Sequence, residues 1–426
     1  MAHIAVVTGI ARSGTNLIGR MLAQHRDFAF AMDPFLPVFK WFRSSVVDQA
    51  RRSSGVPVTE PFPPSAPIDD YYFHGERQRL MEAISAADFR LPFDEANWPL
   101  LQKDLEGRAI HESADLVPYL GELKASTYAS IWQAGMDLVV KHRGKGTPLW
   151  VGVKELWCVE FIPHLVKAFP FAKAVVIVRD PRAVVASMLK MGEDDATQQA
   201  QILSYVRHWR KLAAFLFMFR TMPAMADHLI VVRYEDLVKG PEEKAQELCG
   251  FFGVGYDPAM LDVSGFYDPS RKAAWQGNSS FKASVAEVDA DLANRWETYL
   301  PESSIRLIDF LAGTDMRLFG YEPKTGGIPG SEADIPLEAF IGSYGAQASW
   351  RSDSGDLLLD MGLEIARRSL LASPTRPNED LIKRCFLFTQ VYDGLKKTLV
   401  AQAGRPVAQR DTIAKDKIAP TRHIHE

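Results

Sequence analysis

Residues 6–22 read VVTGIARSGTNLIGRML, and this stretch decides the fold. The apolar run from Ile4 to Val7 predicts a buried strand, and apolar residues recur at helical spacing after the loop. Gly9 and Gly14 bracket that loop with the spacing G-x-x-x-x-G. A strand, a glycine loop and a helix in this order point backbone N–H groups at an anion. The sequence therefore predicts a phosphate or sulfate site here, although a tight strand-to-helix turn is the simpler alternative.

The loop differs from the one found in nucleoside triphosphatases. That loop ends in G-K-[ST], with the Lys on the phosphates and the hydroxyl on Mg²⁺. Here Thr15 and Asn16 follow Gly14, and the basic residue comes earlier, at Arg12 next to Ser13. The loop therefore suits an anion but is poorly suited to a metal-bound triphosphate.

Composition sets the broad class and the partners. The chain has 426 residues, of which 47% are hydrophobic and 24% charged, as in globular proteins with one large domain or two. Its net charge of −4 supplies no overall field that would attract nucleic acid. Only three cysteines occur, far apart, which predicts a reducing compartment rather than a disulfide framework. With neither a long apolar run nor room for a signal peptide before the first strand, we expect a cytoplasmic protein without membrane insertion.

Predicted strands alternate with predicted helices along the chain. The strands cover residues 4–7, 28–30, 149–153, 174–178 and 229–232, and the helices cover 158–168, 183–189, 197–222 and a segment from Pro241. Such alternation predicts a parallel sheet with helices on both faces, a three-layer α/β/α fold. The AVVIV run at 174–178 shows no polar alternation, so we expect it inside the sheet.

The alternating strands and helices belong to a domain that we predict over residues 1–324. Two segments of the chain do not follow the alternation. Residues 45–110 look like an insertion that shapes an acceptor pocket, with a proline-rich loop or lid at 55–70 and a helical segment at 77–87. A further segment, 115–140, also looks helical. From residue 325 a Gly/Pro linker leads to a helical extension over 325–403, and 404–426 are expected to be disordered.

The last predicted helix, 379–402, carries apolar residues that step by three and four, as in a coiled coil. They are Leu381, Cys385, Phe388, Tyr392, Leu395 and Leu399. Packing of this helix back onto the domain is favoured over its use in a homodimer.

Polar residues follow the predicted strands. Asp33, Lys154, Arg179 and Tyr234 each come at or just after a strand end. Because the carboxyl ends of parallel strands share one edge of the sheet, we expect these side chains to gather near the glycine loop. Arg179 and Ser187, eight residues apart, could form a guanidinium and hydroxyl clamp for a phosphate. Asp33 could equally cap the turn before Pro34, and His111, Glu112 and His142 are alternative bases or surface groups.

Together the motifs RSGTN, VKE, VIVRDPRAVVAS, VVRYEDL and GNSSFK resemble the sulfotransferases that use 3′-phosphoadenosine-5′-phosphosulfate (PAPS). The resemblance is greatest to bacterial and Golgi-type members, including tyrosylprotein sulfotransferases. It implies that the loop residues hold the 5′-phosphosulfate, namely Arg12, Ser13, Gly14, Thr15 and Asn16. It implies that the rest of the nucleotide is held by Arg179, Ser187, Tyr234, Ser279, Ser280 and Lys282.

The resemblance also implies catalytic roles. Lys154 corresponds to a lysine on the transferring sulfuryl group, and Arg12 would help neutralise the leaving diphosphate. Asp33 stands where the tyrosylprotein branch has a glutamate base, and this is a departure because Asp is one methylene shorter. The implied reaction is in-line transfer to a hydroxyl or amine without a metal, with a small-molecule, carbohydrate, lipid or peptide acceptor.

Two other functions stay open from the sequence. A Mg²⁺-dependent small-molecule kinase would share the glycine loop, but it normally has G-K-[ST]. A non-catalytic nucleotide-binding scaffold could assemble through the C-terminal helices. The presence of both Arg12 and Lys154 argues against the scaffold, because a protein that only binds a nucleotide has no need of both.

Overall fold

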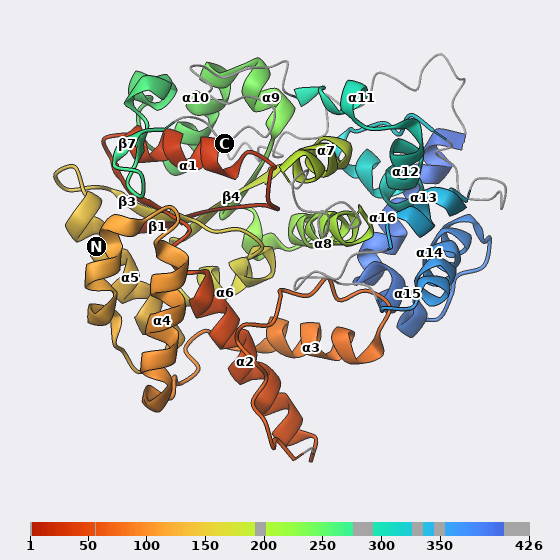
Figure 1. The fold of residues 1–426 in the computed structure, drawn as a ribbon, viewed down its shortest axis with the longest axis horizontal. Helices are drawn as coiled ribbons and strands as arrows, with labels where there is room; N and C mark the ends of the chain where they lie inside the picture. The colour runs from red at the N-terminus through yellow and green to blue at the C-terminus, as the bar shows by residue number, and fades with distance from the viewer. Residues whose placement is uncertain are drawn as a thin grey trace, which may run out of the picture.

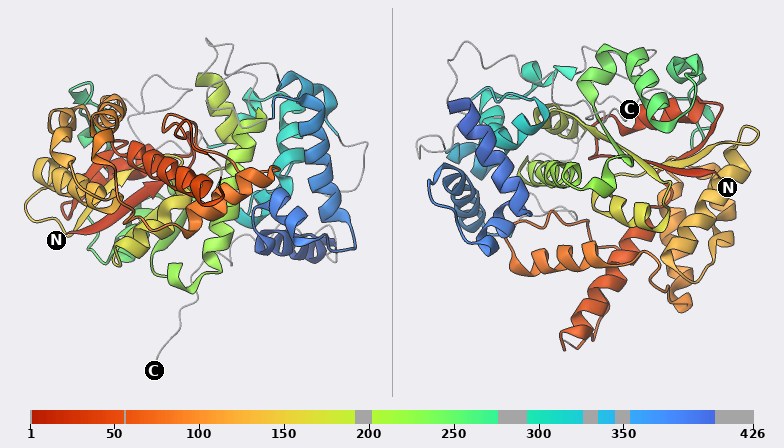
Figure 2. Two further views of the ribbon diagram at one scale, coloured as in Figure 1. Left: turned by 90° about the horizontal axis from the view of Figure 1, so that it is seen from below. Right: turned by 180° about the vertical axis from the view of Figure 1, so that it is seen from behind.

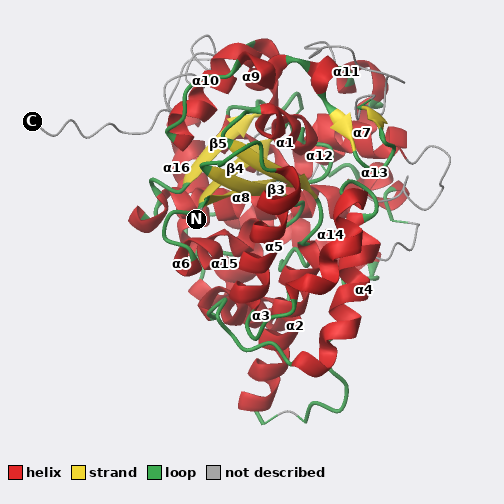
Figure 3. Ribbon diagram, turned by 90° about the vertical axis from the view of Figure 1, so that its left-hand side faces the viewer, coloured by secondary structure: helices red, strands yellow, loops and turns green. Residues whose placement is uncertain are grey.

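A computed structural model describes residues 2–55, 57–191, 202–275, 293–325, 335–344 and 354–403 of the protein. Its centre is a parallel sheet of five strands in the order β2-β3-β1-β4-β5, which Figure 3 shows in yellow among the helices. The strands are β1 (His3–Thr8), β2 (Phe28–Met32), β3 (Trp150–Lys154), β4 (Lys173–Val178) and β5 (Leu229–Arg233). The predicted parallel α/β fold is confirmed, and the AVVIV run lies inside the sheet as expected.

Alternate side chains of the strands bury against opposite faces. In β4, Val175 and Ile177 face one hydrophobic cluster, whereas Val176 and Val178 face the other. The first face is covered by α1 (Thr15–Gln24), α9 (Tyr234–Lys239) and α10 (Pro241–Phe252). The second face is covered by α6 (Ile162–Ala168), α7 (Pro181–Met191) and α8 (Ile202–Arg220). Burial on both faces explains why these strands are apolar throughout rather than alternating.

Between β2 and β3 the chain forms a helical insertion. It contains α2 (Leu36–Ser53), α3 (Gly75–Ala86), α4 (Trp98–Ala109), the 3₁₀ segment η2 (Ala114–Leu123) and α5 (Tyr128–Arg143). The single helix expected over 115–140 is wrong. Pro118 lies in the 3₁₀ segment, and Thr127 starts α5 with a capping box in which its Oγ1 accepts from the Ser130 N–H at 3.1 Å.

The C-terminal helices gather at one end of the molecule, shown in blue in Figure 1, away from the insertion helices α4 and α5 (Figure 2). They are α14 (Leu357–Ala372), α15 (Glu379–Phe386) and α16 (Thr389–Ala403), next to α12 (Glu302–Met316) and α13 (Leu337–Gly342). Short elements elsewhere include α11 (Trp296–Tyr299), β6 (Tyr267–Asp268) and β7 (Ala273–Ala274).

The continuous helix expected over 379–402 is also wrong. It breaks at Leu387, whose backbone has φ 65°, so α15 and α16 are separate helices. Cys385, Tyr392 and Leu395 of the apolar series are buried inside the chain, and α16 packs on α8 and α12. These three residues therefore pack within the chain, the alternative that the sequence favoured, whereas Leu381 of the series is exposed. A homodimer stays a prediction, as does a domain boundary near residue 325.

Buried ion pairs tie α14 to α8. Glu364 of α14 accepts from Arg207 at 2.8 Å and from Arg210 at 2.6 Å, and all three side chains are at most 2% exposed. Asp360 adds a second contact to Arg207 at 2.8 Å. Because a charge at such depth is tolerated only when it is paired, these contacts hold α14 in one position against the domain.

Replacing Glu364 by Gln is therefore expected to lower the free energy of unfolding by about 3–5 kcal/mol, since buried Arg210 loses its carboxylate partner and buried Arg207 keeps only Asp360. Urea denaturation measures this change. The matched control is Glu379→Gln at the exposed start of α15, for which a change within about 0.5 kcal/mol is expected. Equal losses in the two variants would contradict the assigned role of Glu364.

Candidate active site

The predicted residues do meet at the carboxyl edge of the sheet. Asp33 follows β2, Lys154 ends β3, the glycine loop follows β1, Arg179 follows β4 and Tyr234 follows β5. Because the strand order is β2-β3-β1-β4-β5, these groups form a row in which the glycine loop is central. Lys154 and Asp33 stand at one end of the row, and Arg179 and Tyr234 at the other.

The glycine loop is shaped by what packs on it. Gly14 has φ 100°, and a Cβ there would lie 2.9 Å from Cε2 of Tyr234 and 3.1 Å from Cδ1 of Ile177. Ser13 Oγ donates to the Ile10 carbonyl at 2.7 Å, which fixes the turn. Thr15 and Asn16 are the first residues of α1, so the helix begins where the loop ends. Only glycine combines this backbone conformation with such a close ring.

Two arginines and a serine converge beside the loop. Arg12 Nε donates to Ser187 Oγ at 3.0 Å, and Arg179 donates to the Arg12 carbonyl at 3.0 Å. The Arg179 guanidinium carbon also lies 4.2 Å from the centre of the Tyr234 ring. Burial and then the nearby charge of Arg179 lower the pKa of Arg12 from 12.5 to about 10. Two like charges held together at low exposure are the kind of environment that an anionic ligand stabilises.

At the other end of the row, one carboxylate is held by two cations. Lys154 Nζ pairs with Asp33 Oδ2, and Arg108 Nη2 lies 2.9 Å from Asp33 Oδ1. The Asp33 backbone is left-handed, with φ 53°, and its N–H donates to the Lys154 carbonyl at 2.7 Å. Burial raises the pKa of Asp33, but Lys154 and then Arg108 outweigh it, so the net shift is below 3.8. Asp33 is thus ionised at neutral pH, as a base must be.

Glu155, next to Lys154, behaves in the opposite way. Its side chain is buried, and Oε1 accepts from the backbone N–H of Phe35. Burial and then the charge of Asp33 raise the pKa of Glu155 to about 8. The two carboxyl groups of this buried site therefore differ in protonation: Asp33 is ionised and Glu155 is protonated.

The sequence reasoning missed Arg108. It lies in the insertion at the end of α4, far along the chain from every motif, and no local signal marks it. Ser113 fixes this region to β2, because its Oγ donates to the Met32 carbonyl at 2.7 Å and accepts from the Met32 N–H at 3.1 Å. Glu112, considered above as a base, instead pairs with Arg20 at 2.9 Å and accepts from Asn16 at 3.4 Å.

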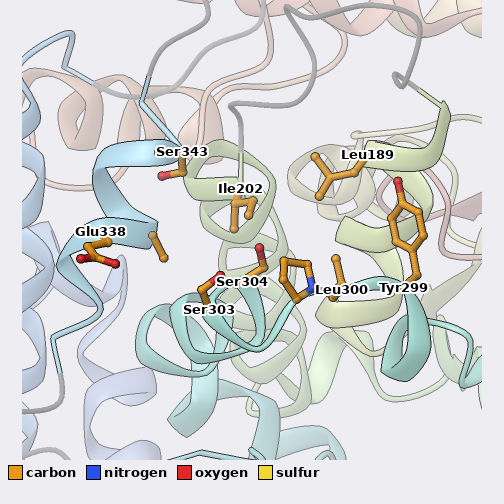
Figure 4. Close-up of a pocket in the computed structure, with 11 residues that line it drawn as sticks. Leu189, Ile202, Tyr299, Leu300, Ser303, Ser304, Glu338 and Ser343 are labelled. Carbon is orange, nitrogen blue, oxygen red and sulfur yellow. The ribbon is translucent and has the colours of Figure 1, made fainter.

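Three predicted nucleotide-binding residues, Ser279, Ser280 and Lys282, lie outside the described residues. A separate cavity of about 550 Å³ opens between α7, α8, α12 and α13 (Figure 4). Its lining includes Leu189, Ile202, Tyr299 and Ser304, and none of the predicted site residues. Within the described ranges, no helix has the length and apolar character needed to cross a membrane. In that same part of the chain, no cluster of three or more His, Cys, Asp or Glu side chains could hold a metal.

The tight packing of Gly14 gives a first test of the site. Gly14→Ala is expected to lower the free energy of unfolding by about 2 kcal/mol, since the left-handed backbone and the Tyr234 ring both oppose a Cβ. Thermal and urea denaturation measure it. The control is Gly250→Ala in α10, where a Cβ meets nothing within 4 Å and a gain of about 0.5–1 kcal/mol is expected. Unchanged stability of Gly14→Ala would refute the described loop geometry.

The protonation of Glu155 gives a second test. Between pH 4.5 and about 8 the folded protein keeps the proton that the unfolded chain loses. Stability should therefore fall as pH rises through this window, at up to about 1.4 kcal/mol per pH unit. Glu155→Gln does not titrate there, so its free energy of unfolding should decline less over the window. An identical pH dependence in Glu155→Gln and wild type would show that Glu155 is not protonated; exposed Glu95→Gln is the control.

Several known proteins are similar to this chain. The family model described as "Sulfotransferase family" matches residues 5–258. Human "Carbohydrate sulfotransferase 3" is 28% identical over 166 residues, which cover 35% of this chain and 33% of the relative. A "Putative protein-tyrosine sulfotransferase" of Caenorhabditis briggsae is 27% identical over 196 residues, covering 44% of this chain and 66% of the relative. The match thus spans between a third and two thirds of these relatives.

Two further comparisons cover more of the chain. "Nodulation protein NoeE" of Sinorhizobium fredii is 22% identical over 338 residues, covering 75% of this chain and 66% of the relative. Among solved structures, "Sulfotransferase Domain from the Synechococcus PCC 7002 Olefin Synthase" is 19% identical with a TM-score of 0.40. That match covers 73% of this chain and 96% of the other.

Proposed function

Because this chain belongs to the sulfotransferase family, we propose that it moves the sulfuryl group of PAPS to a hydroxyl or amine of an acceptor. One observation carries the choice of donor: Arg12, Arg179 and Ser187 converge beside the glycine loop, with Lys154 and Asp33 farther along the same edge. A nucleotide with phosphate groups at both its 3′ and 5′ positions offers anions for both parts of that row.

The residues of the site fit PAPS in chemistry. The glycine loop, with no Cβ at Gly14, leaves backbone N–H groups of the α1 N-terminus for the 5′-phosphosulfate. Arg179 and Ser187 are the proposed holders of the 3′-phosphate, with Tyr234 against the Arg179 guanidinium. The residues predicted to close over the nucleotide, Ser279, Ser280 and Lys282, complete the proposed donor site.

The proposed reaction needs cations and one base. The S–O bond to the leaving 3′,5′-adenosine diphosphate breaks as a new bond forms from sulfur to the acceptor, S–O for a hydroxyl and S–N for an amine, and charge accumulates on the leaving and equatorial oxygens. Arg12 and Lys154 stabilise that charge, while Asp33 takes the proton of the acceptor. Transfer without a metal is part of the proposal, because the basic side chains already supply the positive charge.

The acceptor class comes from the relatives alone. Their names specify carbohydrate and protein-tyrosine sulfotransferases, so sugar and tyrosine hydroxyls are the first acceptors to test. Small molecules and lipids remain further candidates. The three cysteines are free and buried, which supports the proposed reducing, cytoplasmic setting.

Calorimetry with 3′,5′-adenosine diphosphate tests the donor site. We expect metal-independent binding that weakens at least about tenfold in Arg179→Ala and in Arg12→Ala, since each removes a charged donor to phosphate. Exposed Arg90→Ala, with a side chain 53% exposed in the insertion, is the matched control and should bind as wild type does.

The same experiment separates the alternatives. Mg²⁺-dependent binding of ATP without binding of the diphosphate would favour a kinase. A scaffold is favoured only if the protein binds the diphosphate and transfers nothing from radiolabelled PAPS to 2-naphthol, a chitooligosaccharide, a tyrosine peptide or the further small-molecule and lipid candidates. Transfer to one of these acceptors identifies the acceptor class.

A further inference from the structure

We propose that Arg108 is a positioning residue that keeps Asp33 ionised and in place while Lys154 serves the sulfuryl group. The inference rests on the proposed function, in which Asp33 is the base and Lys154 the catalytic cation. It assigns a role in the reaction to the insertion, which carries Arg108 at the end of α4.

The two cations contact different oxygens of the carboxylate. Lys154 pairs with Oδ2, whereas Arg108 Nη2 lies 2.9 Å from Oδ1. The Asp33 side chain is only 7% exposed and that of Lys154 only 1%, so water contributes little to the stability of either charge. Arg108 is 29% exposed and reaches Asp33 from the insertion side. One cation can therefore leave while the other stays.

The position of Arg108 is set by packing rather than by its own flexible chain. Leu101 and Leu105 of α4 are fully buried, and Asp104 accepts from the Trp41 indole at 2.8 Å, which joins α4 to α2. Beyond the helix, Ser113 makes both hydrogen bonds to the backbone of Met32, the residue before Asp33. The end of α4 and the carboxylate are thus fixed to the same strand terminus.

In the proposed reaction Lys154 has two roles that one side chain cannot fill at the same time. It neutralises Asp33 in the free protein, and it must act on the sulfuryl group during transfer. If Lys154 were the only partner of Asp33, its departure would leave a buried carboxylate without a counter-charge, and the carboxylate would hold the lysine back or take up a proton. With Arg108 on Oδ1, the charge stays paired when Lys154 turns away. Oδ2 is then the oxygen that receives the acceptor proton.

The other groups facing Asp33 are consistent with Arg108 staying on the carboxylate while Lys154 acts on the sulfuryl group. From the β3 side they are Lys154, Glu155 and Cys158, and from the insertion side Arg108, with Glu112 beyond it. Burial raises the pKa of Glu155 to about 8, so this neighbour is uncharged at neutral pH. Arg108 is therefore the cation that remains on Asp33 once Lys154 has moved.

Arg108→Gln and Arg108→Lys test the role, with Lys103→Gln as the matched control on an exposed position of the same helix. For the acceptor identified above, Arg108→Gln should move the acid limb of the kcat profile up by about 1–3 pH units, the effect of losing a close opposite charge. The acid limb of kcat/KM should move less, because Lys154 still pairs with Asp33 in the free enzyme. Arg108→Lys should restore most of the profile, and diphosphate affinity should stay unchanged in every variant.

Acid unfolding supplies a readout that needs no acceptor. Asp33 has a lowered pKa, so it contributes stability that is present above pH 3.8 and is lost as pH falls through its folded value. Arg108→Gln should be less stable than wild type near neutral pH, and this difference should shrink as pH falls below 3.8, because the wild type loses more of its Asp33 contribution there. The pH-dependent part of the difference should vanish when both proteins also carry Asp33→Asn. If Arg108→Gln does not fold, the same comparison is made with Arg108→Lys.

An acid limb and an unfolding profile of Arg108→Gln that match those of wild type would overturn the proposal. Equal shifts of kcat and kcat/KM would also overturn it, because they would show no added need for Arg108 after donor binding. Failure of wild type to bind the diphosphate would refute the proposed function instead, and the unfolding comparison would still decide whether Arg108 keeps Asp33 ionised.

Discussion

Parallel pairing of the five strands is the constraint on which this molecule depends. It places every carboxyl strand end at one edge, and with them Asp33, Lys154, the glycine loop, Arg179 and Tyr234. Residues about 200 positions apart in the chain thereby reach a single ligand-sized region. The same pairing buries both faces of the sheet, so the polar side chains of the candidate site lie at this edge.

Buried charge is handled in two ways in this structure. Around Glu364 the charges are paired completely, and the result is a rigid joint between α14 and α8. At the edge of the sheet cations lie close together: Arg12 and Arg179 are neighbouring like charges, and Asp33 meets two cations. Like charges held close together at low exposure favour an anionic ligand, because the ligand would reduce their mutual repulsion.

The insertion and the C-terminal helices contribute differently to the site. The insertion brings α4 against the end of β2 and places Arg108 next to Asp33, so it contributes a side chain to the candidate site. The C-terminal helices pack on α8 and α12, on the side away from α4 and α5 (Figure 2). Their buried pairs hold α8, whose Trp209 indole donates to the Arg179 carbonyl at 2.8 Å and so supports the Arg179 end of the row.

The sequence by itself determined the sheet, its parallel character and most of the row at its edge, because apolar strands and a glycine loop are local patterns that need no distant partner. Local patterns failed where a single backbone angle decided the outcome, as at Leu387, or where a cap such as Thr127 restarted a helix. Only the tertiary structure decided the partners of Asp33 and the protonation of Glu155. Both depend on burial and on charges from segments far apart in the chain, such as Arg108, and burial and proximity arise only when the chain has folded.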